Sequence, residues 1–575
     1  MHPTRRLFAT GLAAVPFAAL AHAQTVAPVT IFEARNIVTM EPSLPSARFV
    51  AVAGDVVLGV AQRLADLEPW TRGRTVSIDR QFRDNILMPG LIDPHVHPMQ
   101  SAVMLNLPFI APDDWKLPSG FSAGVQTPAG YRARLSEALS KNPAAPFITW
   151  GHHELFHGKM DRALLDQIAP HRAVVVWQRS FHDVIANTVA LRDWGLETQQ
   201  AFDAAIKTTG GLVEHGDFER GVFSETALQA ALAKLRSTIL TPEKINAGMA
   251  TMQRMMLQGG VTTVSDMGTG IFANFATEAN LIRSAFERAD NPSRVMLMPM
   301  ATALAGEQDL DRWYAGIEDQ YASRHVRVDK RVKLFADGAF FALNMRMNAP
   351  GYTDGHIGKW LTEPGELRRQ MIRFWEAGFA FHIHVNGDEG LDAVLDGLDA
   401  LPARRGQTVT LEHLGYSTEA QNRRIARMGL MVSAQPNYIR VLGDAYAKEG
   451  LGPDRAEVMN RLGSLERKGV PLGLHSDFNM APIDPLYLAW IAANRLTVAG
   501  NLKSPPERVS LDKALRAITI EAAQVIGLDA MVGSIASGKK ADFAILDRDP
   551  YEAGAAKLRD LKVSGVVFEG MVARV

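Results

Sequence analysis

The chain has 575 residues, of which 47% are hydrophobic, and its 61 basic and 62 acidic side chains give a formal net charge of −1. This length supports a large core and is too great for one simple domain. The balanced charge offers no basic surplus for nucleic acid, so we expect a small-molecule substrate. Because the chain has no cysteine, it has no disulfide framework, and any metal must be held by nitrogen and oxygen ligands.

The first residues are typical of an export signal. Arg5 and Arg6 precede an apolar run from Ala9 to Leu20, which closes on Ala21-His22-Ala23. The run is too short to span a bilayer, and Ala-x-Ala is a cleavage pattern. We therefore expect residues 1–23 to be a twin-arginine signal peptide, leaving a periplasmic or exported protein with no stable membrane anchoring. An uncleaved N-terminal anchor is the alternative.

Both flanks of the remaining chain are β-rich. Short apolar runs occur at Val50–Val60, Ala541–Leu546 and Val563–Phe568. We predict that residues 28–85 and 525–575 pair into one small β-sandwich domain.

Between these flanks, residues 86–524 contain eight apolar runs, most of them separated by helix-like segments. The runs are Ile86–Met88, Val261–Val264, Val295–Met298, Val332–Phe335, Phe379–His384, Val409–His413, Leu430–Ser433 and Val470–Asp477. Short apolar strands that alternate with helices predict an α/β fold, here a (β/α)₈ TIM barrel.

Residues 98–260 separate the first run from the second. A βα connection needs a handful of residues and a helix, so we predict an inserted layer that covers the barrel mouth. This layer is where we expect substrate specificity.

The runs carry side chains that can ligate a metal. Because side chains alternate along a strand, His95 and His97 project to the same side. Ligands at the carboxyl ends of several strands converge at a barrel mouth. We expect a metal site built from His95, His97, Lys333, His384, His413 and Asp477.

Lys333 has two interpretations. An ammonium group has no lone pair, but carbon dioxide converts a lysine into a carbamate, which could bridge two metals. Alternatively, Lys333 is buried and paired with Asp337. The sequence leaves both open.

The combined motifs resemble the amidohydrolase superfamily, and more closely its amidohydrolase-3 branch, which includes YtcJ-like proteins and N-substituted formamide deformylases. The resemblance covers most of residues 28–575. It rests on Pro89–His97, Lys333–Gly338, His384–Asp388, Glu412-His413, Ser476-Asp477 and Gly533–Asp542.

The resemblance implies hydrolysis of a non-peptide C–N bond in an amide, formamide or cyclic amide, with one or two divalent ions, most often zinc, and a carboxylated Lys333. It selects His384 over His382 as a ligand. It gives Asp477 the role of orienting the attacking water and moving its proton. His182 resembles a family histidine that contacts substrate or stabilises an oxyanion.

Other functions remain open. His153-Glu154-Leu155-Phe156-His157 fits the helical His-Glu-x-x-His pattern of zinc proteases. Alternatively, His153 and His157 belong to a loop, where they would either contact substrate or cap the insertion. Tyr438, which follows the seventh apolar run, would either line the pocket or pack at the rim of the barrel. A metal-dependent deaminase of a heterocycle and an exported, non-catalytic binding protein are the alternatives for the whole chain. The sequence does not indicate the oligomeric state.

Overall fold

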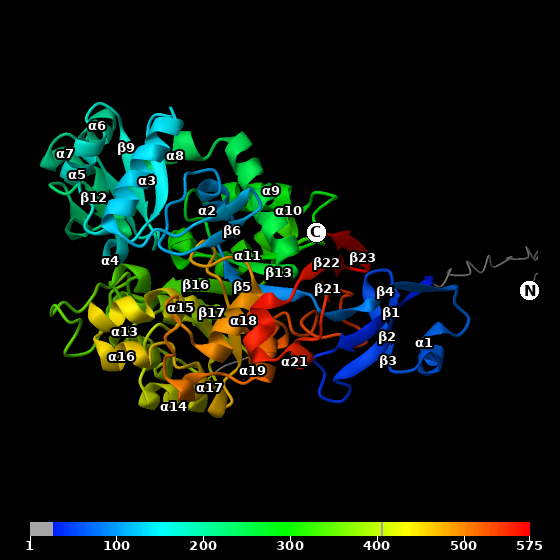
Figure 1. Cartoon of the computed structure of the whole chain (residues 1–575). Coiled ribbons are helices and arrows are strands. Elements are labelled where there is room, and N and C mark those ends of the chain that lie inside the picture. The colour runs from blue at the N-terminus through cyan, green and yellow to red at the C-terminus, as the bar shows by residue number, and fades with distance from the viewer. Residues whose placement is uncertain (1–26, 404–405) are drawn as a thin grey trace, which may run out of the picture.

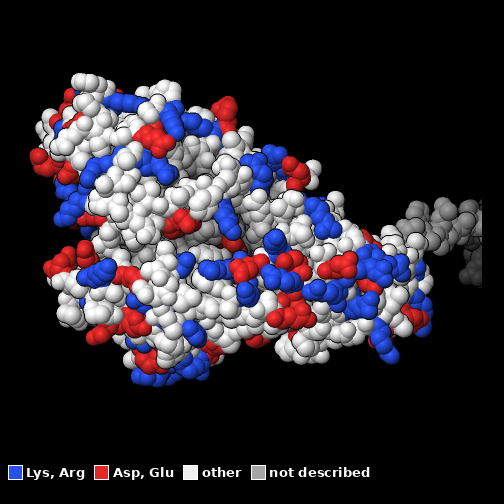
Figure 2. All heavy atoms as spheres, viewed as in Figure 1, with Lys and Arg blue, Asp and Glu red and all other residues white. Residues whose placement is uncertain are grey.

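The computed structural model describes residues 27–403 and 406–575, so the expected signal peptide lies outside the described residues. Figure 1 shows the first and last strands lying together at one side of the molecule, with the long segment after residue 98 rising above the helices that surround the central strands. None of the helices in the described residues combines the length and apolarity needed to cross a bilayer. On the face drawn in Figure 2, basic and acidic side chains are interspersed.

Strands from both ends of the chain form one seven-stranded sheet, in the order β23-β22-β21-β4-β1-β2-β3. Its N-terminal strands are β1 (Val29–Val38), β2 (Ser46–Ala53), β3 (Val56–Ala61) and β4 (Val76–Pro89), with the short helix α1 (Glu68–Thr71) between the last two. Its C-terminal strands are β21 (Phe543–Leu546), β22 (Val563–Phe568) and β23 (Met571–Arg574). Phe32, Phe82 and Phe543 are buried in one apolar cluster, which binds the two ends of the chain together.

The boundary of this sheet corrects one assignment made from the sequence. Ile86–Met88 lie in β4, where they pair with β21, and not in the strand that carries His95. That strand is β5 (Leu91–Val96), and Gly90 separates the two. A Cβ atom at Gly90 would lie 2.1 Å from Thr262 Oγ1, so glycine is required where the chain crosses from one sheet to the other.

Parallel strands form the centre of the molecule in two sheets, ordered β15-β14-β13-β5 and β16-β17-β18-β19-β20. The strands are β5, β13 (Val261–Thr269), β14 (Arg294–Pro299), β15 (Val326–Val328), β16 (Arg331–Phe335), β17 (Ala380–Val385), β18 (Val409–His413), β19 (Met431–Ala434) and β20 (Leu472–Leu474). Each of the seven later runs overlaps one of these strands, whereas the short β15 was not expected. One isolated parallel bridge links Met300, directly after β14, to Lys333 in β16, and another links Val96 in β5 to Phe478, which follows β20.

Helices alternate with these strands, as the α/β interpretation predicts. They are α10 (Phe275–Phe286), α11 (Leu310–Tyr321), α12 (Pro364–Glu376), α13 (Asp388–Asp399), α14 (Glu419–Arg427), α15 (Asn437–Lys448), α16 (Pro453–Glu457), α17 (Leu462–Arg467) and α18 (Pro485–Asn494). The chain then passes through α19 (Leu511–Arg516) and α20 (Ile520–Val525) to the terminal sheet, where α21 (Pro550–Ala553) lies between β21 and β22.

The segment between β5 and β13 has a sheet and an apolar core of its own. The sheet, ordered β11-β12-β10-β9-β8, contains β8 (Phe147–His152), β9 (Val174–Gln178), β10 (Asp183–Ala186), β11 (Gly216–Asp217) and β12 (Val222–Ser224), and β6 (Trp115–Leu117) pairs separately with β7 (Gly120–Ser122). Its helices are α2 (Pro98–Met104), α3 (Pro128–Lys141), α4 (Glu154–His157), α5 (Arg162–Ile168), α6 (Thr188–Asp193), α7 (Gln199–Thr208), α8 (Leu228–Ile239) and α9 (Pro242–Gln258).

Candidate metal centre

All six predicted metal ligands line one cavity of about 560 Å³ at the carboxyl ends of the parallel strands. The other walls come largely from the insertion and include Trp177, Phe181 and Leu232. The cavity therefore lies between the strand ends and the inserted layer, where the sequence predicted substrate contacts.

The first ligand pair meets the carboxylate that follows β20. His97 Nε2 lies 3.2 Å from Asp477 Oδ1, and His95 Nε2 lies 3.6 Å from the same oxygen. His413 Nδ1 lies 3.6 Å from the other oxygen, Oδ2. Four side chains from three strand ends thus place their donor atoms around one small volume, as a metal site requires.

His95, His384 and His413 are in the form that binds metals. Burial lowers the pKa of His384 to about 3 and holds the pKa values of His95 and His413 below their ordinary range. These rings are neutral at pH 7, so each has a nitrogen lone pair. Burial raises the pKa of Asp477, but the neighbouring His97, His475 and Lys333 together lower it below its ordinary value, so Asp477 is a carboxylate.

Glu412 is a site residue whose role the sequence did not reveal. Its Oε2 accepts from His95 Nδ1 at 2.7 Å, and its Oε1 accepts from His382 Nδ1 at 2.6 Å. All three side chains are buried. Glu412 thereby fixes the tautomer of His95, with Nε2 directed to the cavity. It also holds His382 in a hydrogen bond through Nδ1. The choice of His384 over His382 as a ligand agrees with this arrangement.

His475 also belongs to the cluster, although it was not predicted as a ligand. Its ring stacks on His95 with centroids 4.5 Å apart, and it could share a metal with His95 and His413. Neither ring nitrogen has a hydrogen-bond partner among the described residues. The signal was present in the sequence, because His475 and Asp477 repeat the two-residue spacing of His95 and His97.

Lys333 is buried in the cavity wall, and no hydrogen bond to its Nζ is formed within the described residues. Burial lowers the pKa of Lys333 to about 8, against the opposing effect of Glu412. The alternative partner, Asp337, instead accepts from the backbone N–H groups of Asn386, Gly387 and Arg346 at 2.8–2.9 Å. The structure therefore contradicts the Lys333–Asp337 pair.

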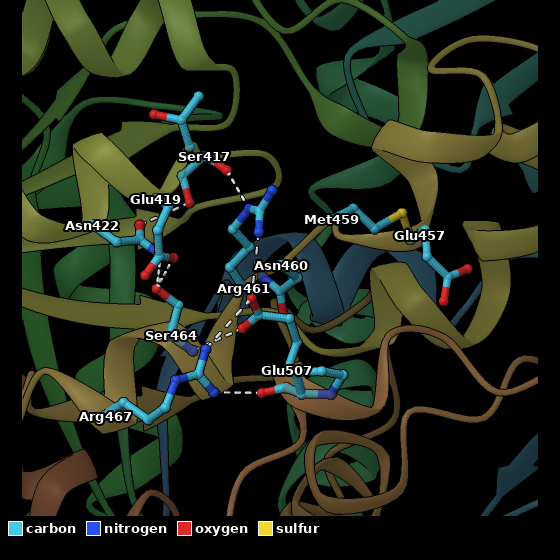
Figure 3. A network of polar contacts seen from close by, with 12 residues as sticks. Ser417, Glu419, Asn422, Glu457, Met459, Asn460, Arg461, Ser464, Arg467 and Glu507 are labelled. Atoms are coloured by element: carbon cyan, nitrogen blue, oxygen red, sulfur yellow. Dashed lines mark hydrogen bonds and ion pairs between the residues drawn. The ribbon is translucent and has the colours of Figure 1, made fainter.

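Strained backbone shapes two of the ligands. His413 has φ +73° and Asp477 has φ +48°, both in the left-handed region that is unfavourable for residues other than glycine. Asn460 Nδ2 donates to the carbonyl oxygens of His413 and Leu414 at 3.3 and 3.1 Å, which fixes the turn after β18. Figure 3 shows Asn460 beside a polar network in which Arg461 and Arg467 contact Glu507.

Of the residues predicted to bind substrate, His182 lines the cavity and Tyr438 does not. His182 lines the cavity, and its Nδ1 lies 2.5 Å from Glu225 Oε2. Tyr438 is buried outside the cavity lining and stacks on Phe340, and its hydroxyl donates to Asn386 Oδ1 at 3.2 Å. The Asn386 amide in turn lies 3.1 Å from His384 Nε2, so Asn386 links Tyr438 to the predicted ligand His384.

His153 and His157 are engaged within the insertion and do not line the cavity. His153 caps α4 by accepting from Leu155 N, while His157 Nδ1 accepts from His153 N and its Nε2 contacts the Val125 carbonyl at 2.7 Å. The helix α4 is one turn long and ends at Gly158, with φ +76°. This geometry lacks the continuous helix on which the protease interpretation depends.

The chain resembles known proteins over most of its length. A model described as the amidohydrolase family matches residues 83–574. Protein LONG AFTER FAR-RED 3 of Arabidopsis thaliana is 24% identical over 544 residues, covering 90% of this chain and 87% of that protein. N-substituted formamide deformylase of Arthrobacter pascens is 26% identical over 517 residues, covering 84% and 88%. The crystal structure of an uncharacterized metal-dependent hydrolase from Pyrococcus horikoshii has a TM-score of 0.67 at 20% identity, covering 92% of this chain and 99% of that one.

The position of Glu412 predicts how its loss affects metal binding. Glu412→Gln removes one of two acceptors from a buried contact, so His95 loses its fixed tautomer, and we expect metal affinity to fall about 10- to 100-fold. Competition with a chromophoric chelator measures this change. Glu376→Gln, at an exposed acid on α12, is the control and should bind metal like the parent protein. Unchanged affinity in Glu412→Gln would show that the carboxylate does not position His95.

Proposed function

The chain belongs to the amidohydrolase family, and on that premise we propose that it hydrolyses a non-peptide C–N bond of a small molecule, in an amide, formamide or cyclic amide, with a bound divalent metal. The observation that carries the proposal is the convergence of nitrogen and oxygen donors, among them the carboxylate of Asp477, in one cavity. The similarity to a formamide deformylase over most of both chains supports this bond class.

The donor set fits one or two divalent ions, such as zinc. His97 Nδ1, His413 Nδ1 and Lys333 Nζ are buried without hydrogen-bond partners among the described residues, and such groups call for an unseen partner. The residues that would hold the metal are His95, His97, Lys333, His384, His413 and Asp477. When bound, a divalent ion lowers the pKa of water to about 7 and polarises a carbonyl group.

Asp477 is the proposed catalytic carboxylate. Gln435 Nε2 donates to its Oδ2 at 2.9 Å, which orients the group, and its low pKa leaves it ionised and ready to accept a proton. We assign it the proton of the attacking water, which it then delivers to the leaving nitrogen. The insertion excludes bulk water from this exchange and provides apolar contacts to the substrate.

Lys333 is the proposed carbamate. Its buried, unpartnered amine with a lowered pKa is more often neutral than a solvent-exposed lysine, and a neutral amine adds to carbon dioxide with loss of one proton. The product is an anion that could bridge two metals. ¹³C NMR after incubation with ¹³C-bicarbonate should show a carbamate carbon that is absent from Lys333→Arg. A spectrum identical to that of the variant would contradict the assignment.

The finer architecture is also a proposal. We infer that the parallel strands close into a (β/α)₈ barrel, because one bridge links β16 to the residue after β14 and another links β5 to a residue that follows β20. We infer that the terminal sheet folds over as a sandwich, because Val50, Phe82 and Val567 of different strands share one apolar cluster.

A substrate panel tests the proposed activity. The metal-loaded protein should hydrolyse at least one N-acyl amine, N-formyl amine or lactam of a panel that also contains lactones. Removal of metal by a chelator should abolish this turnover, with recovery on adding zinc. Amine release measured by a fluorogenic reagent reports C–N cleavage. Turnover that survives complete metal removal would contradict the metal-dependent proposal, and ammonia release from heterocyclic amines alone would indicate deamination.

Asp477→Asn separates catalysis from metal binding. Because asparagine keeps a metal-binding oxygen but cannot take the proton, we expect metal content to stay close to that of the parent protein while kcat falls at least about 10²-fold. Elemental analysis and steady-state kinetics on the best panel substrate measure the two quantities. Asp454→Asn, at an exposed acid on α16, should retain parental turnover. An Asp477→Asn enzyme with full activity would remove Asp477 from the mechanism.

A further inference from the structure

We propose that Arg236 binds a carboxylate group of the substrate at the end of the cavity remote from the metal ligands. The substrate is then an amide, formamide or cyclic amide with an apolar body and an anionic terminal group. This inference rests on the proposed hydrolysis and narrows its substrate class. Arg236 is a specificity-determining residue supplied by the insertion, and it takes no part in the chemical step.

One wall of the cavity begins close to the metal ligands. The ring of His182 lies 6.0 Å, between centroids, from the ring of His384, and its Nδ1 lies 2.5 Å from Glu225 Oε2. The helix α8 begins at Leu228, three residues after Glu225, and both residues line the cavity. The first turn of α8 is therefore near the site of the proposed reaction.

One face of α8 leads from this point to Arg236. Leu228, Leu232 and Arg236 all line the cavity, and their spacing of four residues places them on one face of the helix. A rise of about 1.5 Å per residue puts Arg236 about 12 Å further along the helix axis than Leu228. Arg236 therefore lies at the remote end of the cavity.

The segment Gly270–Ala273 provides a second wall, and all four of its residues line the cavity. It begins two residues after Gly268, where a Cβ atom would lie 3.5 Å from the ring of His97. The fully buried Glu278 accepts hydrogen bonds from three backbone N–H groups of this segment at 2.6–2.7 Å. These contacts fix the wall before any substrate binds, as a selective pocket requires.

Arg236 is a charged group without an acidic partner. The acids that line the cavity are Glu225 and Asp477, and they contact His182 at 2.5 Å and His97 at 3.2 Å. The Arg236 guanidinium forms no hydrogen bond or ion pair within the described residues. A guanidinium is always positively charged, and its donors match the two oxygens of a carboxylate. An anionic group of the substrate is the complement that this end of the cavity lacks.

The space between the two ends suits an apolar body. Leu228, Leu232 and Phe272 line it, and a volume of about 560 Å³ is that of a pocket for a small organic molecule. Arg236 is exposed, so a carboxylate bound there keeps part of its hydration and its desolvation costs little. Burial of the apolar body would supply affinity, and Arg236 would select the charge of the terminal group.

Binding of decanedioate and decanoate tests the site without turnover. Each molecule has one carboxylate that can reach the metal, but only decanedioate has a second one for Arg236. In the zinc-loaded protein, the ratio of the decanoate Kd to the decanedioate Kd should fall at least about fivefold in Arg236→Gln, as measured by titration calorimetry. Lys234→Gln, at an exposed base of the same helix outside the cavity lining, is the matched control and should keep the parental ratio.

Charge reversal and salt make the same test sharper. Arg236→Glu should bind ω-aminodecanoate more tightly than decanedioate, the reverse of the parent protein, because the terminal group now meets a negative charge. The parental preference for decanedioate should weaken as ionic strength rises, since the contact lies near solvent. A ratio that is the same in the parent protein, Arg236→Gln and Arg236→Glu would overturn the proposal.

Kinetics connect the site to the proposed reaction. With N-formyl ω-aminodecanoate as substrate, Arg236→Gln should raise KM at least about fivefold and change kcat less than about twofold, and with N-formyl decylamine both constants should stay at parental values. Equal losses with both substrates would overturn the role of Arg236 in specificity. If neither compound nor any panel substrate is hydrolysed, the proposed function fails, and the dicarboxylate ratio still decides whether Arg236 binds an anion.

Discussion

The arrangement of the site depends on one buried carboxylate, Glu412, whose two oxygens hold imidazoles from two different strands. His95 in β5 and His382 in β17 are both fixed by β18 through contacts of 2.7 and 2.6 Å. Each charged hydrogen bond contributes about 1.5–3 kcal/mol, and loss of one partner leaves a buried charge that costs about 3–5 kcal/mol. A buried carboxylate such as Glu412 is tolerated only when its hydrogen-bond partners are present. The contacts of Glu412 therefore hold β5, β17 and β18 in fixed positions relative to one another. That relation sets the direction in which His95 Nε2 points.

A second buried ion connects the insertion to the loop that carries Asp477. Arg179 is fully buried, donates to the Met480 carbonyl at 2.8 Å and pairs with Asp113 at 3.2 Å. Its guanidinium also lies over the rings of Trp115 and Trp150, at 5.1 and 5.2 Å. The residues that follow Asp477 are therefore fixed by the insertion as well as by β20. Buried contacts thereby join the inserted layer to the loop that carries Asp477.

The terminal sheet serves the site indirectly, by anchoring the strands. Arg294 in β14 is buried against Asp542 and Glu569 of the C-terminal segment, and Gly90 joins the sheet directly to the strand of His95.

The sequence was more informative about which strands form than about where each strand begins and ends. The apolar run at Ile86–Met88 was assigned to the strand of His95 although Pro89-Gly90, a typical turn dipeptide, stands between them, and its pairing with β21 shows the sheet to which it belongs. The short β15 was missed because three residues carry too little pattern to distinguish a strand from a loop.

The sequence by itself determined the alternation of strands and helices. It also determined six predicted ligands, all of which line the cavity. Both follow from local periodicity and from the rule that parallel strands end at one edge of a sheet. It could not identify Glu412 as the partner of His95, since 317 positions separate them. Nor could it pair His182 with Glu225, which lie 43 positions apart. It also could not show that Asp337 accepts from backbone N–H groups and not from Lys333. Those outcomes depend on which polar groups are buried together, and the free energy of burying a charge is decided by neighbours that only the tertiary structure brings into contact.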